Sequence, residues 1–241
     1  MPRFFSDQPP IDGELRITGD DAWHIARSLR LRLNDRLTVC CNRVDYSCTI
    51  LSISDSEIRL RAESSSMSKE PFLRLTLYAA LPKKDKLELV IMKATELGAE
   101  RIVPVLTEFC ALRLTGEQFA KKKQRLERIA YEAAKQSGRG IIPQISDIIS
   151  LDEAVSEMRS MDLGIMLYEK GGVSLGSLGL APGEEKSVGL LVGPEGGFSE
   201  REARLCQENG IKTVWLGPRI LRCETAPIAA ISILLFLNND M

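Results

Sequence analysis

The chain has 241 residues, which suits one large domain or one medium domain with a small companion, and it is long enough to bury a real core. Its hydrophobic content of 44% and charged content of 27% are ordinary for a soluble globular protein. The formal net charge of −1 gives no indication of a polyanionic partner, although a basic face can exist within a balanced total.

Several sequence features argue against a zinc site, a signal peptide and a membrane-spanning helix. The six cysteines form no CxxC motif, and one histidine is too few for the usual zinc patterns, so we expect reduced, mostly structural thiols in a cytosolic protein without a metal. The N-terminal MPRFFSDQPP has no apolar core and predicts no signal peptide. The longest apolar stretch, residues 226–237, is too short to span a bilayer and predicts a buried helix.

The N-terminal part, residues 1–68, is predicted to be β-rich. Its runs RLTVC, YSCTILSIS and EIRLRAES are short, alternating or β-branched, and broken by Asn, Asp and Ser. A basic helix is predicted at residues 20–35. The polar segment Ser64 to Pro71 ends in proline and predicts a linker.

From Phe72 onward, strands and helices alternate. The apolar runs predict strands at residues 73–81, 101–106, 163–168, 188–192 and 213–217. Helical spacing predicts helices at residues 86–99, 119–138, 151–159, 199–209 and 227–237. The alternation favours an α/β domain with a largely parallel sheet.

Two Gly-Pro loops follow successive strands near the C-terminus. LVGPEGGF ends one strand at Gly193, and Ser199 with Glu202 three residues on is a capping box that begins a helix. The next strand, IKTVWL, leads into GPRILRCETAP at residues 217–227. Both loops should emerge at the same sheet edge, outside the carboxyl ends of the strands, where open α/β sheets bind ligands.

Three kinds of ligand compete for these loops. A phosphate loop needs a lysine that is missing here, and Glu195 would repel phosphate. Gly193, Gly196 and Gly197 do not fit the G-x-G-x-x-G spacing of a dinucleotide fold. A nucleoside with a positive centre and no phosphate, such as S-adenosylmethionine, tolerates a nearby carboxylate. The alternative without a ligand is that both loops are simple turns.

Four segments, taken together, resemble the bacterial ribosomal RNA small subunit methyltransferase E family of the SPOUT methyltransferases. They are KLELVIMKATELGAERIVPV, EAAKQSGRGIIPQI, GPEGGFSEREA and LGPRILRCETAPIAA. The N-terminal MPRFF and HIARSLRL resemble the entry domain of that family. The likeness covers nearly the whole chain, and its specific part is GPEGGF together with LRxETA. One departure is Cys223, where threonine is expected.

The resemblance implies a two-domain methyltransferase. It implies a PUA-like β-barrel RNA-binding domain at residues 1–68 and, at residues 72–241, an α/β SPOUT domain with a mostly parallel sheet and a deep C-terminal trefoil knot. Such knots are rare among folds. The implied cofactor is S-adenosylmethionine, the implied partners are a second copy of the chain and the small ribosomal subunit, and the implied product is N3-methyluridine in 16S rRNA near the decoding region.

The resemblance also assigns residues to the cofactor. The implied cofactor-binding residues are Leu167, Tyr168, Glu169, Gly193, Pro194, Glu195, Gly196, Gly197, Leu216, Gly217, Ile220, Leu221 and Arg222. Glycines at the loop let the backbone pass close to the cofactor. For Leu216 and Leu221, ordinary core packing is the alternative.

Methylation of uridine N3 requires the loss of a proton, so a base or a stabiliser of the anion is needed. We predict Glu224 as the base and Arg222 as the partner of the charge that develops on the uracil carbonyl oxygens, with Glu195 as a rival base. The alternative is that Arg222 and Glu224 form a structural ion pair. Alignment of N3, the methyl group and the sulfur can by itself lower the activation barrier by roughly 7–11 kcal/mol in favourable systems.

RNA contact requires cations. Arg3, Arg27, Arg30 and Arg32 are predicted to contact phosphates, and Arg139, which follows a basic helix, is predicted to reach the substrate. The lysine run at residues 121–123 fits a solvated helix face equally well.

Three other functions remain open from the sequence. They are a SPOUT methyltransferase with another target, such as a ribose 2′-oxygen, a non-catalytic RNA-binding or assembly factor, and a nucleotide-dependent enzyme. The missing phosphate lysine disfavours the last. We expect the assembled subunit rather than free RNA to be the substrate.

Overall fold

The computed structural model describes residues 1–83 and 85–241. Its internal contacts divide the chain into two compact units. The first unit consists of Met1–Glu70 and Ala134–Ile141, and the second of Pro71–Ala133 and Ile142–Met241. Each unit has a sheet of its own.

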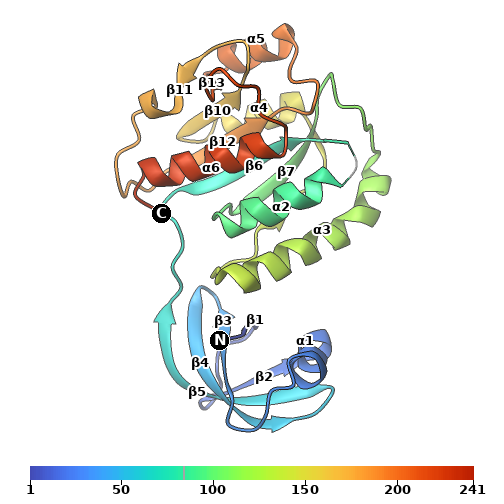
Figure 1. The fold of residues 1–241 in the computed structure, drawn as a ribbon, viewed down its shortest axis with the longest axis vertical. Coiled ribbons are helices and arrows are strands. Elements are labelled where there is room, and N and C mark those ends of the chain that lie inside the picture. The colour runs from blue at the N-terminus through green and yellow to red at the C-terminus, as the bar shows by residue number, and fades with distance from the viewer. Residues whose placement is uncertain (84) are drawn as a thin grey trace. The chain divides into compact units, whose positions relative to one another are not determined.

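The first unit is built on a curled five-stranded sheet in the order β1-β3-β4-β5-β2 (Figure 1). Alternate residues such as Leu15 and Ile17, or Ile58 and Leu60, point into its core because side chains in a strand alternate between the two faces. The strands are β1 (Arg3–Phe5), β2 (Glu14–Thr18), β3 (Arg36–Cys41), β4 (Val44–Ile53) and β5 (Glu57–Met67).

Two predictions for this unit are wrong in extent. The helix predicted at residues 20–35 is limited to α1 (Gly19–Trp23) and a π-helical turn, His24–Ser28. Only Ala22 and Ile25 are buried there, so no apolar stripe holds a longer helix, and Arg30 leaves it with a φ of 52°. The segment predicted as a linker begins as strand, because β5 continues to Met67 and stays paired with β4 beyond a β-bulge.

The second unit contains an eight-stranded sheet in the order β11-β13-β10-β12-β6-β7-β8, in which every pair is parallel. The short strand β9 (Ile149–Ser150) pairs with β7. The remaining strands are β6 (Arg74–Ala80), β7 (Arg101–Leu106), β8 (Gln144–Ile145), β10 (Leu163–Leu167), β11 (Val173–Ser174), β12 (Ser187–Val192) and β13 (Lys212–Trp215).

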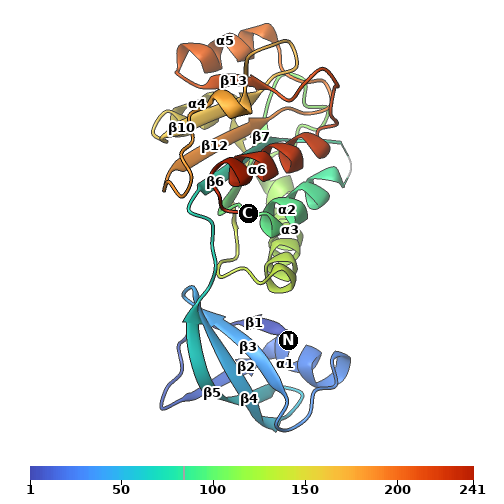
Figure 2. The ribbon, with the colours of Figure 1, turned by 60° about the vertical axis from the view of Figure 1, so that its left-hand side comes forward.

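Helices cover both faces of this sheet, as Figure 2 shows. On one face, α2 (Lys86–Glu96), α3 (Gly116–Ser137) and α6 (Thr225–Leu237) bury side chains against Leu77, Ile165 and Leu190. On the other face, α4 (Leu151–Met158) and α5 (Glu200–Glu208) pack against Tyr78, Met166 and Leu191. The predicted α/β layering with a parallel sheet is therefore confirmed. A 3₁₀ turn, Leu175–Ser177, joins β11 to the following loop.

The C-terminal third of the chain brings distant segments to one edge of the sheet. Strand β13 lies beside β10 rather than beside β12, so the chain passes from one side of β10 to the other in the region where the knot is predicted. Helix α6 then packs next to α2. Five residues of α6 are buried as predicted for this segment, but Phe236 is exposed. Within the described ranges, no helix is both long and apolar enough to cross a membrane.

Candidate active site

The carboxyl ends of three neighbouring strands, β13, β10 and β12, surround a cavity of about 610 Å³. Parallel strands place their carboxyl ends at one edge, which is where ligands of open α/β sheets bind. Every residue that was predicted to bind the cofactor lines this cavity. The lining includes Leu167, Tyr168, Glu169, Gly193, Pro194, Glu195, Gly196, Gly197, Leu216, Gly217, Ile220, Leu221 and Arg222.

The glycine loop after β12 is closely packed at Gly196 and Gly197, where an added side chain would force a neighbour to move. A Cβ on Gly196 would lie 2.9 Å from the Cβ of Phe109, and a Cβ on Gly197 would lie 2.8 Å from Oε1 of Glu169. Gly197 also has a φ of +67°, which side-chain-bearing residues rarely adopt. Glycine at these positions therefore lets the neighbouring turns close around the cavity.

Helix α5 fixes the far end of the same loop. The predicted capping box is confirmed, because Ser199 N donates to Glu202 Oε2 at 2.9 Å and Glu202 N donates to Ser199 Oγ at 3.3 Å. Glu202 is only 4% exposed, and its other oxygen accepts a hydrogen bond from Glu108 N at 2.8 Å. That second bond ties the turn after β7 to the glycine loop, and the sequence alone did not indicate it.

An ionic cluster forms one wall of the cavity, and we call Lys86, Glu195 and Glu224 together the Lys86 cluster. Lys86 Nζ lies 3.0 Å from Glu195 Oε1 and 3.1 Å from Glu224 Oε2. The backbone N–H of Lys83 donates to both oxygens of Glu195, at 3.2 and 3.3 Å. Sequence reasoning missed Lys86, because its segment KKDK is an ordinary charged run in which nothing distinguishes one lysine from another.

The Lys86 cluster keeps both carboxylates ionised. Burial alone would raise the pKa of Glu195, but hydrogen bonds from Lys86 and from backbone N–H groups outweigh it and lower this pKa. The pKa of Glu224 is also lowered, first by its own backbone N–H and further by Cys223 and Lys86. The two carboxylates in turn raise the pKa of Lys86. Glu224 does not line the cavity itself and reaches it through Lys86.

Arg222 stands apart from this cluster. Arg222 is exposed to solvent and lines the cavity. Across residues 1–83 and 85–241, its guanidinium has no hydrogen-bond or ion-pair partner, and Glu224 pairs with Lys86 instead. The alternative of a structural Arg222–Glu224 ion pair is therefore wrong, and the guanidinium is free to meet a substrate.

The lining of the cavity is compatible with S-adenosylmethionine. Its walls combine apolar side chains such as Leu167 and Leu216 with backbone from glycine loops and a few charged groups, as small-molecule sites commonly do. The lysine at the wall, Lys86, is already occupied by two carboxylates and offers no free charge to phosphate. The carboxylate of Glu169 lies beside Gly197 and can face a cationic ligand.

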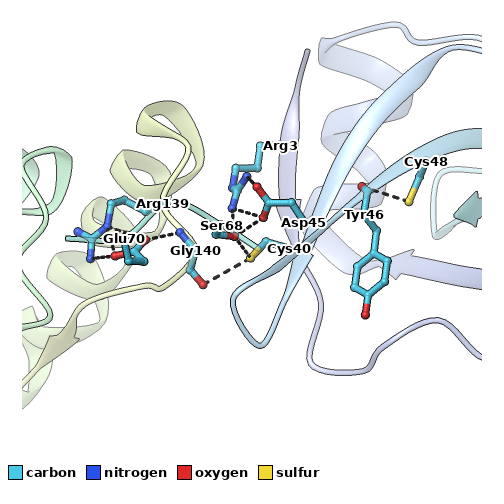
Figure 3. Close-up of polar contacts among 9 residues, drawn as sticks. All are labelled: Arg3, Cys40, Asp45, Tyr46, Cys48, Ser68, Glu70, Arg139 and Gly140. Atoms are coloured by element: carbon cyan, nitrogen blue, oxygen red, sulfur yellow. Dashed lines mark hydrogen bonds and ion pairs between the residues drawn. The ribbon is translucent and has the colours of Figure 1, made fainter. Parts of the chain in front are cut away.

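The arginines predicted to contact RNA occupy two different environments in the first unit. Figure 3 shows Arg3 against Asp45 and Arg139 against Glu70. Arg3 donates to both oxygens of Asp45 at 2.6 and 2.7 Å, and its side chain is 8% exposed. Arg139 Nη2 lies 2.7 Å from Glu70, with side chains 5% and 7% exposed. In this arrangement neither guanidinium is open to a phosphate.

The other predicted RNA contacts lie on the surface. Arg27 is exposed and forms a two-point contact with Asp55, whose shorter distance is 2.5 Å. Arg30 and Arg32 are exposed on the segment that follows. The backbone N–H of Arg32 donates to Asp35 Oδ2 at 2.7 Å, but neither guanidinium has a carboxylate partner within the ranges that the structure describes. They are the cations of this group that remain available to a polyanion.

Comparison with known families matches both parts of the chain. An RNA methyltransferase domain model matches residues 68–235, and an RNA methyltransferase PUA domain model matches residues 17–63. Among curated proteins, the ribosomal RNA small subunit methyltransferase E of Bacillus subtilis is 34% identical over 225 residues, which cover 90% of this chain and 87% of that protein.

Solved structures agree over almost the full length. A ribosomal RNA small subunit methyltransferase E from Neisseria gonorrhoeae, bound to S-adenosyl methionine, has a TM-score of 0.88 at 29% identity and covers 98% of both chains. A putative methyltransferase from Legionella pneumophila with the bound cofactor has a TM-score of 0.87 at 30% identity, covering 97% of this chain and 96% of that one. These matches confirm the predicted fold class, a PUA-like domain followed by a SPOUT domain.

Proposed function

The chain belongs to the ribosomal RNA small subunit methyltransferase E family, and from this premise we propose that it methylates N3 of one uridine in 16S rRNA. It is an S-adenosylmethionine-dependent ribosomal RNA methyltransferase. The observation that carries the proposal is the cavity at the carboxyl ends of β10, β12 and β13, where the cofactor residues and a free guanidinium meet. The choice of uridine N3 rests on the family resemblance, and the guanidinium is consistent with it because it can stabilise a uracil anion.

The chemistry at N3 is an activation problem. When bound, S-adenosylmethionine supplies a methyl group on a cationic sulfur. The N3–H bond of the uracil must give up its proton, so that the nitrogen lone pair can form the new N–C bond while the methyl–sulfur bond breaks. Negative charge then spreads over the two uracil carbonyl oxygens. Arg222, exposed at the cavity and unpaired, is placed to donate hydrogen bonds to such an oxygen.

The two carboxylates near the cavity are poorly suited to accept the N3 proton. A carboxylate with a lowered pKa is a poor base for an amide-like N–H, and both Glu224 and Glu195 have a lowered pKa. We therefore place most of the activation in Arg222, which stabilises the anion, and the N3 proton leaves to solvent water at the open side of the cavity. Glu224 does not line the cavity and serves as an ion-pair partner of Lys86 instead of as the base that the sequence predicted, and Glu195 shapes the glycine loop.

We also propose a homodimer and a division of labour between domains. Exposed apolar side chains lie on the neighbouring helices α2 and α6, namely Leu89, Ile233 and Phe236, and a second copy could cover them. Residues 1–68 act as the RNA-binding domain and residues 72–241 as the methyltransferase domain, which the two family matches support. A ribosomal substrate makes the cytoplasm the proposed location.

The decisive experiment uses tritiated S-adenosylmethionine and small ribosomal subunits from cells that lack the endogenous activity. Digestion to nucleosides and mass spectrometry should give N3-methyluridine. Another methylated nucleoside would keep the cofactor and replace the target, and absence of label with intact cofactor binding would indicate a binding factor. Equal methylation of protein-free 16S rRNA would contradict the proposal that the assembled subunit is the substrate.

A further inference from the structure

Lys86 joins three segments that are far apart in the sequence. It is the first residue of α2, in the loop region that follows β6. Its ammonium reaches Glu195 in the loop after β12 and Glu224 at the end of the loop after β13. These two loops carry most of the cofactor residues and Arg222. One side chain thus holds both loops against the helix.

The contact has the geometry of a fixed bridge rather than a loose surface pair. The side chains are 28% exposed for Lys86, 27% for Glu195 and 16% for Glu224, so water screens them only in part. Glu195 is also held by the Lys83 backbone, and Glu224 accepts a hydrogen bond from Cys223 Sγ at 3.2 Å. The Cys223 thiol, whose pKa is raised by burial to about 12, stays neutral and adds no charge.

Two carboxylates that share one ammonium would face each other without it. Like charges at such a site disfavour simultaneous ionisation, so one carboxylate would take up a proton and the pair would titrate as a coupled unit. The loops would also lose their common anchor. Other charged groups also line the cavity. Within the described part of the chain, Glu169 makes no ion pair with Lys86, and Arg219 and Arg222 make none with Glu195 or Glu224.

We infer that Lys86 is a positioning residue for methyl transfer, because it locks the glycine loop and the Arg222 loop into one arrangement through Glu195 and Glu224. This inference rests on the proposed function for its kinetic consequences. It acts through other residues and does not itself touch the reacting atoms. Misplacement of a catalytic group by about 1 Å can lower a rate about 100-fold, so the bridge can matter even though it is remote from N3.

The test compares Lys86→Met with Lys86→Arg and with the double variant Lys86→Met/Glu224→Gln. We expect Lys86→Met to lower kcat about 10- to 100-fold while KM for the small subunit changes less than about threefold. Lys86→Arg should recover most of kcat because it restores the charge. The double variant should be faster than Lys86→Met alone, since it removes the facing charge as well.

A pH series supplies a readout that a purely structural role would not move. In the wild type, both carboxylates stay ionised across the working range, so affinity for S-adenosylmethionine measured by calorimetry should be flat down to mildly acidic pH. In Lys86→Met, the coupled carboxylates should make that affinity pH-dependent nearer to neutrality, and Glu224→Gln in the same chain should remove the dependence.

Lys93→Met is the matched control. Lys93 lies on the same helix and pairs with Glu96 at 2.8 Å with similar exposure, but it does not line the cavity. It should leave kcat and the pH series unchanged. An unchanged kcat and pH series in Lys86→Met, or a double variant no better than the single one, would overturn the inference. If wild-type protein methylates no RNA, the proposed function fails, while the calorimetric series still decides the role of Lys86.

Discussion

Two ion-paired groups of the chain are alike in chemistry but differ in their surroundings. The Lys86 cluster lies at a cavity, with side chains 16–28% exposed, whereas Arg139 and Glu70 in the first unit are 5% and 7% exposed. A pair that keeps contact with water can lose a member and remain folded, so its charge is available for function. A buried pair cannot, because the remaining charge would have no compensation. Burial, rather than residue type, separates the functional cations from the structural ones.

The largest expected effect tests the buried side of this comparison. Arg139→Met should lower the free energy of unfolding by about 3–5 kcal/mol, since Glu70 would be left buried without its partner. Chemical denaturation with fluorescence or circular dichroism measures this loss. Replacing both members, as Arg139→Met with Glu70→Leu, should recover much of it.

The same variant also distinguishes the structural role of Arg139 from the predicted contact with substrate. Stability close to wild type together with weaker binding to RNA would return Arg139 to the list of RNA contacts. The close packing around Arg139 favours the structural role. The next residue, Gly140, lies so close to Ser68 that an added Cβ would meet the Cβ of Ser68. Cys40 Sγ also donates to the Gly140 carbonyl oxygen at 3.4 Å (Figure 3).

The second prediction concerns the exposed side. Arg222→Ala should lower kcat about 100- to 1,000-fold, the usual loss when a donor to a developing oxyanion is removed. Affinity for S-adenosylmethionine and the melting temperature should stay close to wild type, because no partner of Arg222 is left unpaired. Single-turnover kinetics with the small subunit measure the rate. Arg201→Ala, an exposed arginine on α5, is the control, and an unchanged rate in Arg222→Ala would remove Arg222 from the catalytic residues.

The parts of the site that could be predicted from the sequence are those that depend on local patterns. Loop glycines, the capping box of Ser199 and Glu202 and the alternation of strands and helices are local patterns, and all of them appear where expected. The cavity lining followed from motifs that are contiguous in sequence. What each charged side chain pairs with is not local, because Lys86 lies more than a hundred residues before Glu195 and Glu224.

Long-range contacts also explain the predictions that differ from the structure. The segment at residues 20–35 has the charge pattern of a basic helix, but it lacks the buried stripe that tertiary packing would need, and it ends early. Ser64 to Met67 look like a polar linker, but the ladder with β4 is formed by backbone groups and does not depend on apolar side chains. Arg3 and Arg139 could be recognised as cations, and only the fold shows that carboxylates already hold them.

A third prediction separates two effects of adding a side chain to a loop glycine: the steric contact at the cavity and the strain of a left-handed backbone. Gly197→Ala should weaken S-adenosylmethionine binding about tenfold, because the new Cβ, 2.8 Å from Oε1 of Glu169, would displace this carboxylate from its place in the cavity lining. Gly210→Ala is the matched control: its φ is +79° against +67° for Gly197, but nothing lies within 4 Å of an added Cβ. Both variants should lose about 1–2 kcal/mol of stability from the left-handed conformation, and only Gly197→Ala should lose affinity in calorimetry. Equal affinity in the two would show that Glu169 can move aside without loss of cofactor binding.

The smallest effect is expected on RNA affinity, from substitutions of the surface arginines. Arg30 and Arg27 are both exposed, but only Arg27 is paired with a carboxylate. Arg30→Gln should reduce the slope of log affinity against log salt concentration by slightly less than one, as the loss of one phosphate contact predicts, and should weaken RNA binding only modestly. Arg27 is already neutralised by Asp55, so Arg27→Gln should change the slope less. Asp55→Asn should then strengthen RNA binding and steepen the slope, because it frees a guanidinium that the fold now holds. A slope unchanged in Arg30→Gln but reduced in Arg27→Gln would mean that the ion pair with Asp55 opens on RNA, and that exposure alone does not identify the contacting cation.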